Sequence, residues 1–310
     1  MTKISIVVPI YNEKESIKLF YTAVEAIHQA ELNEYVFEYW FIDDGSTDDS
    51  LAEVKALQEV TDQVHYVEFS RNFGKEAGLY AGLEQATGDY VVVMDVDLQD
   101  PPELLPEMVA SVTSGEWDAV GTRRMNRVGD PKIRSWFSEL FYKIINLISD
   151  TKLVNGERDY RIMNRKIVDV ILNMPEYNRF SKGIFSWVGF KTKYLEFSNV
   201  NRVAGSTSWS FWKLFKYSLE GIVNFSETPL LLVSGAGILT VLASILGALF
   251  IIIRAWLNPA SAIFGWPSMI VILLAVSGIQ MFSLGIVGRY IASIFSEVKH
   301  RPIYIARNIK

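Results

Sequence analysis

The chain has 310 residues, of which 50% are hydrophobic and 21% charged, and its formal net charge is -5. This acidic balance argues against a general nucleic-acid binder, and we expect no nucleic acid among its partners. The absence of cysteine excludes a disulfide framework and thiolate metal sites. The length suffices for one sizeable domain with an attached segment.

The first half of the chain alternates between the patterns of strands and helices. Strands are predicted at Ile4–Pro9, Tyr35–Ile42, Val64–Phe69, Tyr90–Met94 and Trp117–Gly121, and helices at Lys14–Gln29, Ser50–Gln58 and Glu76–Ala86. Such alternation predicts an α/β fold with a mainly parallel sheet and right-handed crossovers. Ligands of these sheets bind beyond the carboxyl ends of the strands.

Polar residues cluster where four of the predicted strands end. The clusters are Pro9–Glu13, Asp43–Ser46, Ser70–Lys75 and Asp95–Asp97. Because the carboxyl ends of parallel strands share one edge of a sheet, we expect the clusters to form one site.

The fourth cluster carries the strongest chemical signal. An apolar strand pattern ends in Asp95, Asp97 and Asp100, whose burial would be costly without a counter-charge. On an extended backbone Asp95 and Asp97 point the same way, and Gln99 continues the row. Such oxygen ligands suit Mg²⁺ or Mn²⁺. The alternative is an acidic loop that caps a helix starting near Pro101.

Two stretches near the C-terminal end contain no charged residue, namely Leu230–Ile253 and Pro267–Gly288. Each is long enough to cross a bilayer as a helix, and together they predict a transmembrane hairpin. The alternative is a pair of buried core helices. Basic residues after the second stretch place that tail in the cytoplasm. Two crossings return the chain to its starting side, so we expect a multi-pass cell-membrane protein with its first domain and both termini cytoplasmic.

Two aromatic-rich segments, Arg134–Ile148 and Trp209–Phe225, have lysine or arginine at helical spacing. We expect amphipathic helices in the membrane interface, with ordinary core-facing helices as the alternative. The predicted organisation is a cytoplasmic catalytic domain (1–208, with 134–148 interfacial), a juxtamembrane helix (209–227), two spans within 228–290 (about 230–253 and 267–288) and a cytoplasmic basic tail (291–310).

The polar clusters suit a nucleotide diphosphate. Its base and ribose need hydrogen-bonding partners, for which Asp44 is a candidate, and its phosphates need a divalent cation, which Asp97 and Gln99 would hold. The leaving group needs positive charge as it departs. Arg202 lies in a Gly/Ser loop suited to that role, although a solvated surface arginine is the alternative.

These motifs resemble the family 2 glycosyltransferases of the GT-A fold. The resemblance rests on Ile6–Glu13, Ile42–Asp48 and Asp95–Pro102. Arg158–Arg165, the Arg202–Trp209 loop and the two spans narrow it to the polyisoprenyl-phosphate glycosyltransferases, relatives of dolichyl-phosphate mannose synthase. Phe73-Gly74-Lys75 is similar to the bacterial undecaprenyl-phosphate glucosyltransferase branch.

The resemblance implies roles for the matching residues. Those at nucleotide-binding positions are Pro9, Tyr11, Glu13, Asp44, Lys75, Asp95 and Arg202. Those at lipid-phosphate positions are Arg123, Arg134 and Ser138. Asp97 and Gln99 would bind Mg²⁺ or Mn²⁺, and Asp97 and Asp159 would serve catalysis, with Asp159 either a base or an orienting group. The chain departs from the family at Arg158, where glycine is frequent, and at Ser208, where lysine is frequent.

The function that the resemblance implies is inverting transfer of a hexose from a nucleotide sugar, with UDP-glucose favoured, to polyprenyl phosphate. Undecaprenyl phosphate is the expected acceptor, at the cytoplasmic membrane face. A processive polysaccharide synthase is an alternative, but its usual Gln-x-x-Arg-Trp motif is missing. A non-catalytic sugar-nucleotide sensor or membrane scaffold would not need Asp159. The sequence leaves undecided whether the chain forms a homo-oligomer.

Overall fold

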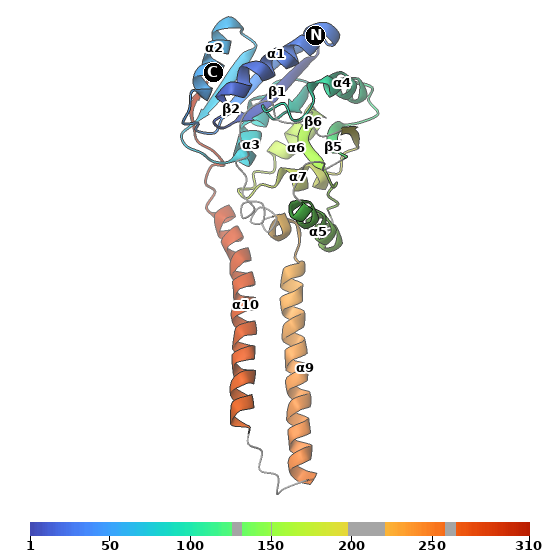
Figure 1. Cartoon of the computed structure of the whole chain (residues 1–310), viewed down its shortest axis with the longest axis vertical. Coiled ribbons are helices and arrows are strands. Elements are labelled where there is room, and N and C mark those ends of the chain that lie inside the picture. Colours follow the sequence, from blue (N-terminus) through green and yellow to red (C-terminus); the bar gives the residue numbers. More distant parts are fainter. Residues whose placement is uncertain (126–131, 150, 198–220, 258–264) are drawn as a thin grey trace.

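The computed structural model describes residues 1–125, 132–149, 151–197, 221–257 and 265–310. Within these residues, the strands form one sheet in the order β7-β5-β6-β4-β1-β2-β3-β8. Figure 1 shows this sheet with the helices around it. The strands are β1 Lys3–Ile10, β2 Val36–Asp43, β3 Val64–Phe69, β4 Tyr90–Val93, β5 Ala119–Arg124, β6 Glu157–Asn164, β7 Thr192–Phe197 and β8 Ala306–Ile309. The helices are α1 Lys14–Glu31, α2 Ser50–Val60, α3 Lys75–Gln85, the 3-10 helix η1 Pro102–Leu104, α4 Leu105–Thr113, α5 Lys132–Ile148, α6 Arg165–Leu172, α7 Ser181–Trp187, α9 Thr228–Leu257 and α10 Trp266–Val298.

The strands β1 to β4 are parallel, and the helices that connect them cover both faces of the sheet. Along β1, Ile6 and Val8 pack into a core that includes side chains of α1, α2 and α4. Val7 points to the other face, where it meets side chains of α3, α6 and α7. Strands buried on both faces read as continuous apolar runs, which explains why the sequence reveals them.

The sheet is mixed rather than mainly parallel in its outer part. β6 runs antiparallel between β4 and β5, and β8 runs antiparallel beside β3. The α/β fold with the parallel strands β1 to β4 is confirmed, whereas β6, β7 and β8 were not predicted. Because β6 is antiparallel to β4, its first residues lie at the edge where β4 ends.

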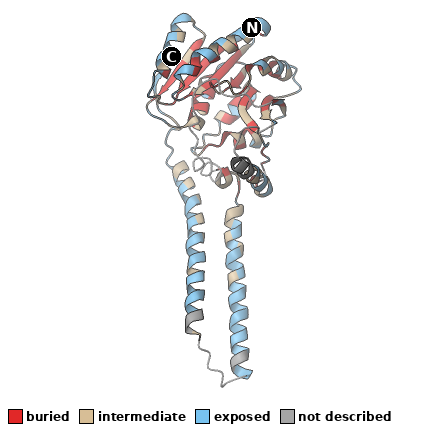
Figure 2. Cartoon of the chain, in the orientation of Figure 1, coloured by how far each residue is buried: buried red, intermediate tan, exposed pale blue. Residues whose placement is uncertain are grey.

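α9 and α10 extend side by side from the sheet-containing part of the chain (Figure 1). Both are long and apolar enough to cross a membrane, and their apolar windows are not buried within the chain (Figure 2). α10 continues past the expected end of its span at Gly288. The chain then returns to the sheet as β8, where Ala306 pairs with Phe69.

Candidate active site

The loops after β1 and β2 are tied together by Asn12. Its backbone has a left-handed φ of 55°. Its side-chain oxygen accepts the backbone N–H of Thr47 at 2.8 Å, and its own N–H donates to Ser46 Oγ at 3.0 Å. Two of the predicted polar clusters therefore lie side by side at one sheet edge.

Asp44 joins the third cluster to this edge. Its carboxylate accepts the N–H of Phe73 at 2.6 Å and that of Gly74 at 2.9 Å. Gly74 has a φ of 97°, which a residue with a side chain rarely adopts. Burial raises the pKa of Asp44 to about 6, against the effect of the two N–H donors. Asp44 thus holds the turn immediately before Lys75, the first residue of α3.

Lys75 is the centre of an ion-pair network. Its Nζ lies 2.6 Å from Asp95 Oδ1 and 2.5 Å from Asp159 Oδ2. The pairing follows from strand register, since Val93 of β4 lies opposite Arg161 of β6, and Asp95 and Asp159 each lie two residues further toward the same edge. Although burial works against both charges, the pairing holds the pKa of Lys75 above its usual range and that of Asp159 well below.

Arg158 supplies the counter-charge that the burial of Asp100 requires. The Asp100 side chain is fully buried, and Arg158 Nε donates to it at 2.7 Å. Arg158 also lies 3.9 Å from Asp95. In the sequence, Arg158 stands out only as a departure from the family pattern. The cost of burying Asp100 was the signal that such a partner had to exist.

Lys182 is a further cation that sequence reasoning missed. It donates from Nζ to the carbonyl oxygen of Glu157 at 3.0 Å, and its charge adds to that of Lys75 in stabilising ionised Asp159. It lies on α7, and no motif in its surroundings marks it.

Asp97 and Gln99 lie in a turn, not on an extended strand. β4 ends at Val93, and Leu98 has a left-handed φ of 55°. The extended geometry expected from Asp95 to Gln99 is therefore wrong, and Asp95 faces Lys75. Asp97 is 6% exposed and accepts the N–H of Gln99 at 3.2 Å.

The described residues contain no group of three or more His, Cys, Asp or Glu side chains arranged to hold a metal ion. Asp97 and Gln99 still offer two oxygen donors within one turn. That donor set fits Mg²⁺ or Mn²⁺, because Mg²⁺ is commonly held by one or two protein carboxylates while substrate phosphates and water complete its shell.

The remaining nucleotide-site candidates lie along the same edge. Pro9 is in β1 and faces Gly78 of α3, where an added Cβ would lie 3.4 Å from Pro9 Cβ. Tyr11 is 43% exposed beyond β1. Glu13 precedes α1, and its N–H donates to Ser50 Oγ at 2.8 Å. Arg202 lies outside the described residues.

Arg123 is the lipid-phosphate candidate whose side chain the structure describes. Arg123, at the end of β5, forms an ion pair with Glu196 of β7. Arg134 and Ser138 belong to α5, but their side chains lie outside the description. These three assignments stay predictions.

The charged site lies at the carboxyl edge of the parallel strands β1 to β4, which is where ligands of open α/β sheets bind. The pattern of glycosyl transferase family 2 matches residues 5–172. The chain belongs to this family and is a glycosyltransferase. The match ends before α7, so Lys182 lies beyond it.

Two relatives match over nearly the whole chain. A prophage bactoprenol glucosyl transferase homolog of Escherichia coli K12 is 41% identical over 99% of this chain and 99% of its own length. The bactoprenol glucosyl transferase of Shigella phage SfV is also 41% identical, with the same coverage. Among solved structures, glucosyl-3-phosphoglycerate synthase from Mycobacterium tuberculosis with Mn²⁺, UDP-glucose and phosphoglyceric acid aligns with a TM-score of 0.46 at 20% identity, covering 72% of this chain and 78% of that one.

Proposed function

We propose that the protein transfers glucose from UDP-glucose to the phosphate of a membrane-bound polyprenyl phosphate, with inversion at the anomeric carbon. The observation that carries this proposal is the end-to-end match to proteins named bactoprenol glucosyl transferases, with both apolar helices included in the match. Undecaprenyl phosphate is the proposed acceptor.

The nucleotide would lie over the joined loops at the ends of β1, β2 and β3. Tyr11 is exposed there, and the turn held by Asp44 leads into Lys75. We assign base and ribose contacts to Pro9, Tyr11, Glu13 and Asp44. Asp95, held by Lys75, would border the sugar phosphate.

The departing diphosphate requires positive charge. A divalent cation held by Asp97 and Gln99 would neutralise part of the charge that develops on it. Arg202, from the loop before the membrane helices, is assigned to the same task. Lys75 and Arg158 keep the surrounding carboxylates paired, so these carboxylates add little repulsion against the nucleotide.

Asp159 is suited to orienting groups rather than to removing a proton. Its pKa is held well below the usual range, which makes it a weak base. The proposed nucleophile is a phosphate monoester with a second pKa of about 6, so it is largely dianionic at neutral pH and needs no base. Positioning of the two substrates and electrostatic stabilisation would then supply most of the rate enhancement.

The acceptor would reach the site from the membrane surface. Its tail stays in the bilayer, which requires the catalytic domain to be held against the interface. The chain leaves that domain before α9 and rejoins its sheet through β8 after α10, which supports a hairpin with both ends on one side of the membrane. We assign that side to the cytoplasm because basic residues follow the second apolar stretch. Arg123, Arg134 and Ser138 are the proposed contacts of the acceptor phosphate.

Incubation of the purified protein with labelled UDP-glucose and undecaprenyl phosphate tests this function. We expect label in a charged lipid that extracts into organic solvent, with no label when the acceptor is omitted. Label in a polymer would contradict the proposal, and so would transfer from another labelled donor at a higher kcat/KM. The product's anomeric configuration, read by NMR, tests inversion.

A further inference from the structure

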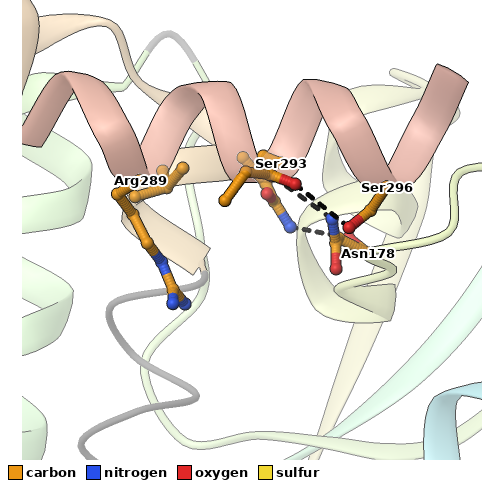
Figure 3. Close-up of a pocket in the computed structure, with 7 residues that line it drawn as sticks. Asn178, Arg289, Ser293 and Ser296 are labelled. Carbon is orange, nitrogen blue, oxygen red and sulfur yellow. Dashed lines mark hydrogen bonds between the residues drawn. The ribbon is translucent and has the colours of Figure 1, made fainter.

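A polar cavity of about 140 Å³ lies where α10 meets the sheet-containing domain. Figure 3 shows its labelled lining residues, Asn178, Arg289, Ser293 and Ser296. None of the predicted site residues lines it. Its remaining lining residues are Val223, Asn224 and Ala292.

The α10 wall of the cavity has one polar face. Arg289, Ser293 and Ser296 follow at intervals of four and three residues, so they project from the same side of the helix (Figure 3). The opposite wall is made by amides, since Asn178 Nδ2 donates to Ser293 Oγ at 3.2 Å and Asn224 Nδ2 donates to the Asn178 carbonyl at 2.6 Å.

The position of this face along α10 coincides with the expected membrane boundary. Arg289 is the first charged residue after the uncharged stretch Pro267–Gly288. Basic residues at such a boundary attract anionic lipid groups. Ile291, Ile294 and Phe295 remain about 60% exposed on the remaining surface of α10, where a lipid chain can lie beside the cavity.

We propose that this cavity binds the phosphate group of a membrane lipid. A guanidinium carries five N–H donors, so Arg289 can donate to a phosphate beside another partner, and the Ser293 hydroxyl can donate once more. The proposal rests on α10 crossing the membrane and not on the transfer reaction. A prenyl phosphate and a bilayer phospholipid share this chemistry, and the experiment separates them.

The cavity is connected to the active-site network through one short segment, Tyr177–Lys182. At one end, the N–H groups of Tyr177 and Asn178 donate to the Glu297 carboxylate of α10 at 3.0 and 3.2 Å. At the other end, the N–H of Ser181 donates to Glu76, the neighbour of Lys75, at 3.0 Å. A phosphate held beside Asn178 would therefore order a segment that reaches the charges around Asp159.

The test measures binding to the detergent-solubilised full-length protein. The probes are inorganic phosphate, dihexanoyl phosphatidylglycerol and farnesyl phosphate. Arg289→Gln should weaken binding of at least one of the two lipid probes by about tenfold or more, as expected for the loss of a charged hydrogen bond. Ser293→Ala should weaken binding of the same probe by a few-fold, as expected for the loss of a neutral hydrogen bond. Lys299→Gln removes a positive charge from the same end of α10 without altering the cavity lining, and its affinity should stay within about twofold of the wild type.

The pattern of losses identifies the source of the phosphate. Loss confined to farnesyl phosphate indicates a prenyl phosphate, loss confined to phosphatidylglycerol indicates the bilayer, and an equal loss for inorganic phosphate indicates a free-phosphate site. Unchanged binding of every probe in folded Arg289→Gln and Ser293→Ala would overturn the proposal, as would equal weakening by Lys299→Gln. Transferase activity is measured separately, so an inactive protein that binds lipid contradicts only the proposed function.

Discussion

The ammonium group of Lys75 lies 2.5 Å from a carboxylate oxygen of Asp159, although 84 positions separate the two residues in the chain. The same ammonium group reaches Asp95, so one cation joins the ends of β4 and β6 to the start of α3. This arrangement holds charged groups of three elements in place before any substrate binds.

Lys75→Met should destabilise the protein because it leaves two carboxylates without their main partner. The Lys75 side chain is 32% exposed, so we expect the lower end of the range of about 3–5 kcal/mol for breaking a buried pair. The thermal unfolding midpoint should fall by about 5–10 °C. Lys14→Met, which removes the exposed pair with Asp49, serves as control and should leave the midpoint nearly unchanged. Equal midpoints for the two variants would show that the Lys75 network contributes little.

Asp159→Asn should lower kcat without changing the shape of its pH profile. A general base contributes about 10²–10⁴-fold and imposes an ascending limb near neutral pH when its pKa lies there. The pKa of Asp159 is too low for such a limb. Steady-state rates from pH 5 to 9 for both proteins provide the measurement. A wild-type limb that disappears in Asp159→Asn would instead identify Asp159 as the base.

Asp97→Ala should abolish Mn²⁺ binding and nearly all transfer while the protein remains folded. The carboxylate is one of only two proposed protein ligands, so its loss cannot be compensated by the site. Electron paramagnetic resonance of Mn²⁺ titrated with the protein and UDP reports binding independently of activity. Asp62→Ala removes an exposed carboxylate before β3, at the opposite sheet edge, and should bind Mn²⁺ as the wild type does. Unaltered Mn²⁺ binding by Asp97→Ala would show that the metal is bound by other residues.

Asp44 should make the wild-type protein less stable as the pH rises from about 4 to 6. Its pKa is about 6 in the folded chain and about 3.9 when unfolded, so the folded state holds the extra proton within this window. The stabilisation is complete below the unfolded pKa and is lost as pH rises through the folded pKa. Asp44→Asn lacks this titration, so its midpoint relative to wild type should increase from pH 4 to 7. Parallel curves would contradict the burial of an ionisable Asp44.

Removal of Ile303–Lys310 should weaken UDP binding as well as stability. Ser70, which opens the loop leading to Lys75, donates its N–H to the Ile305 carbonyl at 2.9 Å, and its own carbonyl accepts from Arg307 at 3.3 Å. The Tyr304 ring stacks on Phe69 with centroids 4.9 Å apart. We expect the midpoint to fall by at least about 5 °C, with a several-fold rise in the Kd for UDP. Lys310→Ala keeps the strand and serves as control, and an unchanged Kd after truncation would show that the loop holds without β8.

The parallel half of the sheet could be predicted because its strands are apolar on both faces, and the observed β3 matches the predicted Val64–Phe69. β6 was not predicted because charged residues interrupt its apolar pattern. Inside the fold, the charges of Arg161 and Glu157 neutralise each other, with Arg161 Nη2 lying 2.5 Å from Glu157 Oε1. β8 is short and polar, and its partner lies far away in the chain, with Asn308 donating to Glu68 across 240 positions.

In the candidate active site, local sequence patterns likewise reveal single residues but not the contacts between residues that are distant in the chain. Each carboxylate at the end of β4 is visible as a strand terminus, and Asp159 is visible from its motif. Their pairing through Lys75 depends on the register between β4 and β6, which no local pattern encodes. The turn at Leu98 also depends on a single left-handed residue that is not a glycine, so the sequence carries no signal for it.

The return of the chain to β3 has a consequence for the order of biosynthesis. β3 is made before both apolar helices, whereas β8 follows them, so the hydrogen-bonding edge of β3 stays without β8 until the hairpin has been made. An uncovered strand edge invites pairing with other chains. In the proposed topology, insertion of α9 and α10 would therefore act as a checkpoint, because only a hairpin that returns its end to the starting side lets β8 complete the sheet.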